Sequence, residues 1–399
     1  MPETTYDAAE AAPAQLASAL LEAALSRNES TPTPASSGLD EIDTVALHGG
    51  FRYGEITSIA GASGTGKTLI VLHAVASHLL QHKKGEVAFI DTTGSFSPMR
   101  LRDIILVRLK RQIQPSALKQ SGYVYEKLPH DAVAKDNNLL RNEATEMLDR
   151  VRVMRVFDFA GVVEAVGEVG ENCERISRLD ENRKRHQHCE TSENATREIA
   201  DSQDEDEENG NVEVVGGAMY DAEGSRMAKC EVPVSDQDED IVGVGMIVLD
   251  TVTNVVGSLM AKSQVQGKGH ALVTTLIRSL RHLCTRYSIC TLVVNSAVGL
   301  HPSNSPTYQR RTEDNASIFE STAGKPALGK TFSYLIGTSI FLSIIPKTRE
   351  DAEIAFGDGN ARQWNSVGVF EVLKDIRGIC EGQWALFRMA DGVGLKSAY

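Results

Sequence analysis

Residues 61–68 (GASGTGKT) constrain the fold of this chain more than any other feature. They match the pattern G-x-x-x-x-G-K-[ST]. A short apolar run, residues 55–60, precedes them, and an apolar stretch without Gly or Pro, residues 69–76, follows. Glycines let successive backbone N–H groups curl around a phosphate chain, and the amino end of a helix adds partial positive charge there. The segment therefore predicts a strand, a phosphate-binding loop and a helix.

Roles for individual loop residues follow from this pattern. Lys67 would reach the β and γ phosphates of a nucleoside triphosphate, and Thr68 would hold Mg²⁺ through its hydroxyl. The expected nucleotide-binding residues of the loop are Gly61, Ala62, Ser63, Gly64, Thr65, Gly66, Lys67 and Thr68.

The rest of the chain alternates short apolar runs with helical patterns, which is typical of an α/β protein with a mainly parallel sheet and helices on both faces. Expected helices cover residues 68–82 and 271–287. The expected strands are residues 55–60, 87–90, 151–156, 246–249, 291–294, 339–344, 367–373 and 384–389. Because no long helical segment separates the last three strands, we expect an antiparallel meander at one edge of the sheet.

Asp250 is a second candidate for the nucleotide site. It ends the apolar run of residues 245–249, as expected of a strand whose carboxylate meets the Mg²⁺ shell beside a phosphate loop. The expected metal ligands are therefore Thr68 and Asp250.

The acidic charge of the chain is concentrated in one segment. Residues 172–240 hold 20 Asp and Glu against 8 Lys and Arg, which is −12 of the net −13. A polar segment of this kind buries too little apolar area to offset its ordering entropy, so we expect a disordered insertion. Residues 1–37 are expected to form a tail with a short amphipathic helix (15–25) and a flexible linker (30–37). Residues 38–399 form the expected core, interrupted by 172–240.

The expected compartment is a reducing one, without membrane association. Six scattered cysteines with no C-x-x-C pair favour a reducing compartment. The apolar residues 16–25 are too few to span a bilayer, and the acidic first residues argue against a transit peptide. Residues 183–185 (RKR) could belong to a nuclear import signal.

Several further segments resemble the core of RecA-like recombinases: 37–40 (SGLD), 49–57 (GGFRYGEIT), 89–101 (FIDTTGSFSPMRL), 325–330 (KPALGK) and 390–394 (ADGVG). The resemblance covers residues 38–399 apart from the acidic insertion. Among eukaryotic members the D-type paralogue fits best, through residues 325–329 and three substitutions. The resemblance implies a RecA-like ATPase core that binds ATP with Mg²⁺ and acts in homologous recombination in the nucleus.

The substitutions weaken what the resemblance implies about hydrolysis. Thr93 stands where the family has a glutamate that activates the attacking water, and Ser296 stands where a glutamine senses the γ-phosphate. Ile340 lies near the place of an expected arginine. Threonine is no carboxylate base at neutral pH, and loss of such a base typically lowers the rate by about 10² to 10⁴. We expect ATP binding to be retained through Lys67, Thr68 and Asp250, with at most weak DNA-dependent ATPase activity.

By the same resemblance, single-stranded or branched DNA would pass two loops, residues 257–270 with Lys262 and Lys268, and residues 297–324 with Arg310 and Arg311. Cations there would neutralise backbone phosphates in a salt-sensitive way, although ordinary solvated loops have the same composition. The implied partners are another RecA-like paralogue in a hetero-oligomer and the main strand-exchange recombinase.

The sequence thus favours an accessory subunit that assists recombinase assembly on DNA. Two alternatives stay open. An active strand-exchange recombinase would need another carboxylate, for which Glu86 and Glu320 are the candidates. A small-molecule kinase would need a lid with arginines and an acceptor pocket, against which the strand-rich carboxyl-terminal part argues.

Overall fold

The computed structural model describes residues 16–18, 32–120, 130–199, 243–261, 266–299, 317–319, 322, 324–356 and 365–398. Two compact units make up the chain. The first unites Met1–Cys173 with Gly243–Tyr399, and the second is Glu174–Val242. The sheet and the site described below belong to the first unit.

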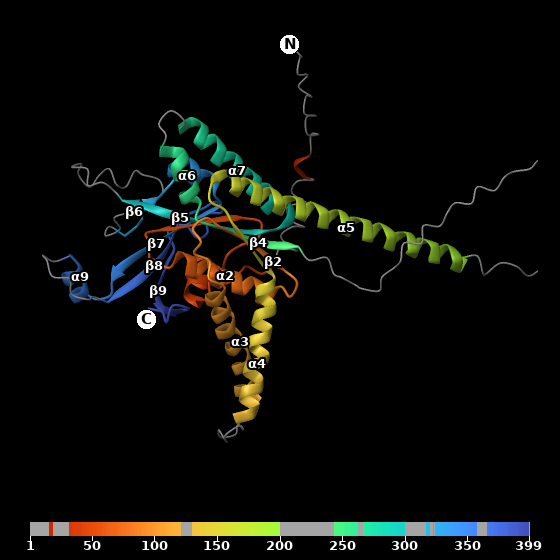
Figure 1. The fold of residues 1–399 in the computed structure, drawn as a ribbon, viewed down its shortest axis with the longest axis horizontal. Coiled ribbons are helices and arrows are strands. Elements are labelled where there is room, and N and C mark those ends of the chain that lie inside the picture. The colour runs from red at the N-terminus through yellow and green to blue at the C-terminus, as the bar shows by residue number, and fades with distance from the viewer. Residues whose placement is uncertain are drawn as a thin grey trace, which may run out of the picture. The chain divides into compact units, whose positions relative to one another are not determined.

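The first unit is built on one large sheet (Figure 1). Its strands are β1 (Ile56–Gly61), β2 (Glu86–Asp91), β3 (Val151–Arg155), β4 (Val244–Asp250), β5 (Cys290–Gly299), β6 (Gly324–Pro326), β7 (Thr338–Pro346), β8 (Ser366–Asp375), β9 (Trp384–Ala390) and β10 (Gly394–Ser397). They follow the order β10-β9-β8-β7-β1-β5-β4-β2-β3, and β6 pairs with β5.

The sheet is parallel from β7 to β3 and antiparallel at the other edge. β1 pairs in parallel with both β5 and β7, and β4 lies between β5 and β2. β8, β9 and β10 continue the sheet beyond β7 with antiparallel pairing. The predicted α/β class, with a mainly parallel sheet and an antiparallel edge, is confirmed.

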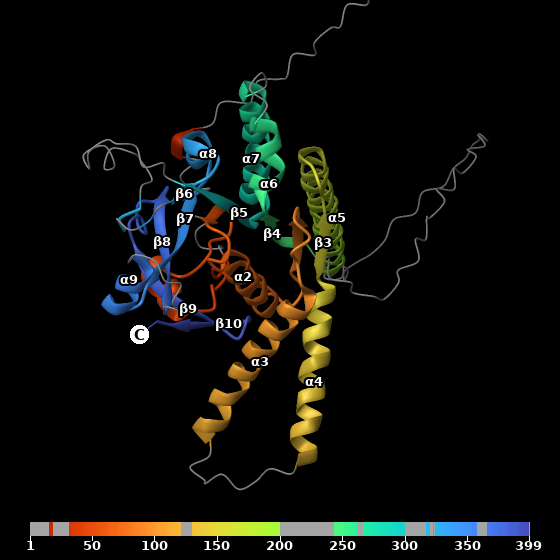
Figure 2. The ribbon, with the colours of Figure 1, turned by 60° about the vertical axis from the view of Figure 1, so that its left-hand side comes forward.

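Helices cover both faces of this sheet (Figures 1 and 2). They are the short π-helical turn η1 (Ile42–Ala46), α2 (Lys67–Gln81), α3 (Pro98–Gln120), α4 (His130–Asp149), α5 (Phe159–Ile199), α6 (Val252–Ala261), α7 (Gln266–Tyr287), α8 (Gly329–Leu335) and α9 (Arg349–Phe356). The sequence predicted α2 and most of α7, whereas the other helices were not placed in advance.

Alternating strand residues build two cores, one on each face of the sheet. In β2, Val87 and Phe89 pack with apolar residues of η1, α2, α3 and α4. Ala88 and Ile90, which point the other way, pack with α5, α6, α7 and α8. Successive side chains of a strand point to opposite faces, so a strand covered on both sides is apolar throughout.

In two segments the structure describes more order than the sequence suggested. The carboxyl-terminal end of the linker expected over residues 30–37 packs against the core. Ala35 and Ser37 are fully buried, and Ala35 pairs with Phe51 through two backbone hydrogen bonds. Part of the expected disordered insertion is helical, because α5 continues to Ile199. Residues 172–199 contain no Gly or Pro, which would interrupt a helix. The i,i+4 ion pair Glu174–Arg178 also favours the helix, although the polar composition of the segment had predicted disorder.

Candidate nucleotide-binding site

The loop between β1 and α2 has the backbone conformation that its glycines allow. Gly64 and Gly66 adopt φ values of 81° and 92°, in the left-handed region that other residues avoid. Gly61 is required for a different reason: a Cβ there would lie 2.6 Å from the carbonyl oxygen of Leu342 in β7. The structure thus places a glycine-rich loop at the amino end of α2, where helix N–H groups lack partners within the helix.

Lys67, the first residue of α2, folds back onto this loop. Its Nζ donates hydrogen bonds to the carbonyl oxygens of Gly61 at 2.9 Å and Ala62 at 2.6 Å. Burial lowers the pKa of Lys67, while the nearby carboxylate of Asp250 opposes that shift. The ammonium group therefore lies at the loop, where it could exchange these carbonyl oxygens for phosphate oxygens.

The structure brings Thr68 and Asp250 together. The Thr68 hydroxyl donates a 2.9 Å hydrogen bond to the carboxylate of Asp250, the last residue of β4. Asp250 is buried, and this burial raises its pKa, against the hydroxyl hydrogen bonds from Thr251 and Thr68. Hydroxyl and carboxylate oxygens are ligands that Mg²⁺ prefers, and the metal usually needs only one or two protein ligands beside phosphates and water.

Asp91 is a site residue whose role the sequence did not reveal. It ends β2 directly beside Asp250 in the parallel register. Its carboxylate accepts backbone hydrogen bonds from Thr93, Gly94 and Phe96 at 2.8 to 3.0 Å. Burial raises the pKa of Asp91, but these N–H donors outweigh burial and leave the pKa lowered. An Asp followed by Gly and Ser was a signal for such a side-chain-capped turn.

Thr93 lies in the turn that Asp91 organises. It is exposed, and its hydroxyl donates to the Ser95 hydroxyl at 2.8 Å. Glu86, one alternative source of a catalytic carboxylate, is the first residue of β2 and pairs with Arg152 at 2.6 Å. It therefore lies at the opposite end of the strand from Thr93, and the structure excludes it from this site. The second alternative, Glu320, lies outside the described residues.

Asn295 and Ser296 follow the buried part of β5. The Asn295 side chain accepts a hydrogen bond from the Thr253 hydroxyl at 2.5 Å and donates one to the carbonyl oxygen of Ala327 at 2.9 Å. The backbone N–H of Ser296 donates to the same Thr253 hydroxyl. The Asn295 side chain thus links β5 to α6 and to the backbone at Ala327 by hydrogen bonds. The short Ser296 side chain takes no part in these hydrogen bonds. Ile340, near the place of the expected arginine, is fully buried in β7.

The candidate DNA-binding residues can be placed only in part. Lys268 falls within α7, while Lys262, Arg310 and Arg311 lie outside the described residues. The described end of the second loop is held by Glu371, a buried residue of β8. Glu371 accepts hydrogen bonds from the Ser317 hydroxyl at 2.6 Å and the Ile318 N–H at 2.7 Å. This carboxylate in the middle of an apolar strand could have been noticed in the sequence.

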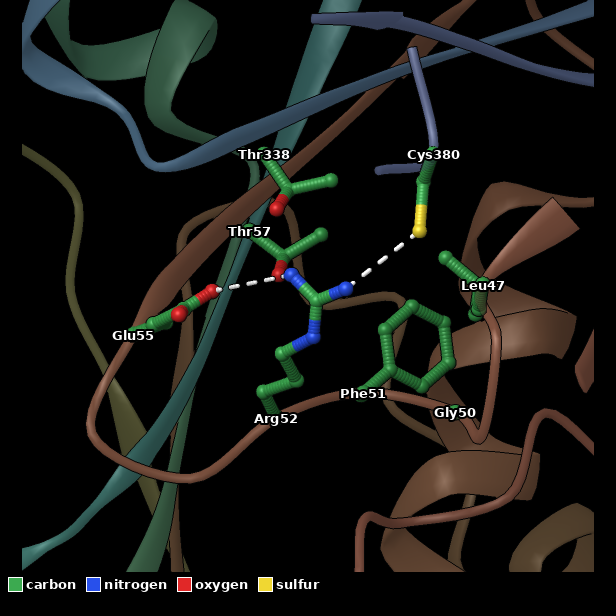
Figure 3. Close-up of a pocket in the computed structure, with 8 residues that line it drawn as sticks. All are labelled: Leu47, Gly50, Phe51, Arg52, Glu55, Thr57, Thr338 and Cys380. Carbon is green, nitrogen blue, oxygen red and sulfur yellow. Dashed lines mark hydrogen bonds and ion pairs between the residues drawn. The ribbon is translucent and has the colours of Figure 1, made fainter. Parts of the chain in front are cut away.

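A pocket at the amino end of β1 offers little room for a ligand (Figure 3). Arg52 fills its centre, contacting Glu55 at 3.7 Å and Asp375 at 3.2 Å and donating to the Cys380 sulfur at 3.3 Å. Its lining residues are Leu47, Gly50, Phe51, Arg52, Glu55, Thr57, Thr338 and Cys380. The phosphate loop follows the other end of β1, so this ionic cluster is separate from the candidate site and fastens the β8–β9 turn to the chain before β1.

No helix in the described ranges is both long and apolar enough to cross a bilayer. The same ranges contain no cluster of three or more His, Cys, Asp and Glu side chains arranged to hold a metal ion.

Comparison with known proteins points to recombination proteins. Residues 32–159 match the family model described as Rad51, a range that includes the phosphate loop and β2 but not Asp250. The chain is 22% identical over 268 residues to the probable DNA repair protein RAD51 homolog 4 of Dictyostelium discoideum, covering 67% of this chain and 59% of the relative. It is 22% identical over 308 residues to the DNA repair protein RAD51 homolog 4 of Bos taurus, covering 77% and 60%. The chain thus spans about 60% of the length of these relatives.

One further sequence match and one structural match are to RadB proteins. The DNA repair and recombination protein RadB of Thermococcus gammatolerans is 44% identical over 73 residues, which is 18% of this chain and 30% of RadB. The crystal structure of the RadB recombinase matches with a TM-score of 0.46 and 16% identity, over 91% of this chain and 99% of that one.

Proposed function

We propose that this chain binds ATP with Mg²⁺ between the phosphate loop and the carboxyl ends of β2 and β4, and that it assists homologous-recombination repair as an accessory RecA-like paralogue. The observation that carries the proposal is the 2.9 Å hydrogen bond between Thr68 and Asp250, which are 182 residues apart in sequence. This hydrogen bond places the loop hydroxyl beside the carboxylate at the end of β4, and a hydroxyl and a carboxylate in this arrangement hold Mg²⁺ in nucleotide sites of this kind.

The residues present fit this cofactor. The loop offers two glycines in the left-handed region and the amino end of α2, so that backbone N–H groups can converge on phosphate oxygens. Lys67 supplies a positive charge at the same place. Thr68 and Asp250 would hold the metal, and phosphate oxygens of the nucleotide would supply further ligands.

The site lacks a residue suited to rapid hydrolysis at the expected position. The exposed Thr93 hydroxyl cannot take a proton from water at neutral pH. Asp91 is engaged by the backbone N–H groups of its own turn, and its lowered pKa makes it a weaker base. ATP would then act mainly as a ligand that stabilises the folded state, by about 2.7 kcal/mol at 100 times its dissociation constant.

The role in repair rests on resemblance. The relatives that match most of this chain are named as DNA repair proteins and RAD51 homologues. These names support a nuclear subunit that contacts single-stranded or branched DNA, another RecA-like paralogue and the main strand-exchange recombinase. The D-type assignment, the DNA contacts of Lys262, Lys268, Arg310 and Arg311, and the accessory role are parts of this proposal.

A binding measurement tests the proposal. Titration calorimetry with a slowly hydrolysed ATP analogue and Mg²⁺ should show binding by the purified chain. Because charge-assisted hydrogen bonds contribute about 1.5–3 kcal/mol, Lys67→Ala should weaken affinity by at least tenfold. Lys83→Ala serves as the control, since Lys83 is exposed beyond the other end of α2. Unchanged affinity in Lys67→Ala would overturn the site, and ATP turnover by wild type at a recombinase-like rate would overturn the accessory role.

A further inference from the structure

The last glycine of the phosphate loop rests on two side chains of β9. A Cβ built on Gly66 would lie 3.0 Å from the sulfur of Met389 and 3.5 Å from Cε2 of Phe387. Phe387 and Met389 are two residues apart in one strand, so they point to the same face. Phe387 is fully buried, whereas Met389 is 45% exposed. The antiparallel edge of the sheet thus packs against the last glycine of the phosphate loop.

Phe387 itself occupies space that only a glycine leaves open. Gly368 of β8 lies directly opposite Phe387 in the antiparallel register. A Cβ built on Gly368 would lie 2.5 Å from Cζ of the ring and 2.7 Å from both Cε atoms. Carbon atoms in contact are normally about 3.5–4.0 Å apart, so the ring fills the place of the missing side chain. An aromatic ring packed across a strand glycine is a recognised way to stabilise such a pair.

One edge of the ring faces both glycines. The same Cε2 atom approaches the Cβ position of Gly368 at 2.7 Å and that of Gly66 at 3.5 Å. Protein interiors are close-packed, so a fully buried ring that is displaced from Gly368 must press on its neighbours. Gly66 is one of those neighbours, and it is the N-cap residue of α2, directly before Lys67.

We propose that Phe387, seated on Gly368, is a positioning residue that holds the last turn of the phosphate loop in its phosphate-binding conformation. Backbone N–H groups attract an anion only when they converge, and Gly66 fixes the direction of the first N–H groups of α2. Phe387 makes no polar contact with the nucleotide and acts through Gly66. The inference deepens the proposed ATP binding and rests on it.

The test uses four variants of the full chain. Gly368→Ala places a methyl group against the ring. Phe387→Leu removes the ring atoms Cε1, Cε2 and Cζ, which that methyl group would meet, and the double variant combines the two changes. Val369→Ala is the matched control, because Val369 is fully buried in the same strand but points to the opposite face. Urea unfolding would measure the loss of stability in each variant.

Two readouts separate this inference from the proposed function. The first is affinity for the ATP analogue with Mg²⁺. Gly368→Ala should weaken it by about tenfold, Val369→Ala should leave it within twofold, and Phe387→Leu added to Gly368→Ala should restore most of it. The second readout is hydrogen exchange of residues 61–68 without nucleotide, which should be faster in Gly368→Ala and near wild type in the double variant.

Each outcome has one meaning. If wild type binds no nucleotide, the proposed function fails, whereas faster exchange of residues 61–68 in Gly368→Ala would still support a loop held by Phe387. Wild-type exchange and affinity in a folded Gly368→Ala would overturn the inference. An equal loss of affinity in Val369→Ala would also overturn it, because the effect would then follow from lower stability. Should Gly368→Ala fail to fold, Phe387→Leu alone must raise the exchange rate of the loop, because the place of the ring beside Gly368 is then empty, whereas in the double variant the alanine methyl group occupies part of it. No change in the exchange rate of Phe387→Leu refutes the idea.

Discussion

Two buried histidines of α2 should make the fold sensitive to mild acid. Burial, reinforced by the charge of Arg108, lowers the pKa of His73 to about 4. Burial and the neighbouring His82 lower the pKa of His78 to about 3, with a smaller effect from Arg150. Each neutral imidazole makes a hydrogen bond. Nε2 of His73 is 2.9 Å from the carbonyl oxygen of Val393, and Nδ1 of His78 is 2.7 Å from the Tyr53 hydroxyl.

The sign and size of the effect follow from proton linkage. The unfolded chain binds protons at these imidazoles below pH 6.5, while the folded protein does not until near pH 4 for His73 and pH 3 for His78. The stability they contribute is therefore full above pH 6.5 and is lost as the pH falls. Between pH 7.5 and 5.0 we expect a loss of about 2 kcal/mol for each histidine, or about 4 kcal/mol together. This value depends mainly on the unfolded pKa, because both folded values lie well below 5.

Other buried groups oppose this trend. Burial raises the pKa of Asp43, Asp250 and Glu371. A carboxyl group whose pKa is raised on folding binds its proton more tightly in the folded state, so it adds stability as the pH falls. A wild-type pH profile alone would mix the two effects.

A comparison between variants isolates the histidines. Urea unfolding at pH 7.5 and 5.0 would be measured for wild type and for a double variant, His73→Gln and His78→Asn, whose amides can replace the bonds from Nε2 and Nδ1. The double variant should lose about 4 kcal/mol less than wild type between the two pH values. If both proteins lose the same stability over this interval, the reasoning is wrong.

Three further changes test the site. Thr93→Glu should raise DNA-stimulated ATP turnover by about 10² to 10⁴ if only the base is missing, with Thr93→Gln as the uncharged control and phosphate release as the assay. Asp250→Asn should remove most of the Mg²⁺ dependence of nucleotide affinity in calorimetry, and an unchanged dependence would place the metal elsewhere. Glu371→Ala removes both acceptors of the 317–318 segment, so limited proteolysis there should be faster than in Glu371→Gln, which keeps one acceptor oxygen.

The sequence was most informative where strands are buried on both faces. The central strands β1, β2, β4 and β5 appear as apolar runs, and their expected cores agree with the structure, although the expected β5 stopped five residues before Gly299. The short strands β6 and β10 were missed, because three or four residues show no period. The helical part of the acidic segment was missed because composition alone says little about local i,i+4 pairs such as Glu174–Arg178.

For the site, the local pattern sufficed where neighbouring residues act together. Residues 61–68 predict a phosphate loop by their own spacing, and Asp250 is a candidate because an apolar strand ends there. The role of Asp91 depends on which backbone N–H groups turn toward it, and the role of Phe387 depends on a glycine in another strand. The turn around Asp91 is local and had a signal in the sequence, whereas the contact of Phe387 comes from the fold and has no fixed spacing in the sequence.

The support of the phosphate loop by β9 has a consequence during protein synthesis. At about 5–20 residues per second, Phe387 leaves the ribosome roughly 15–60 s after Gly66. A contact of α2 is as distant in sequence, since His73 and Val393 are 320 residues apart. A half-made chain would therefore expose an unsupported loop that holds ATP poorly. Nucleotide capture would then be one of the last steps in the maturation of this protein, and it would favour finished molecules over incomplete ones.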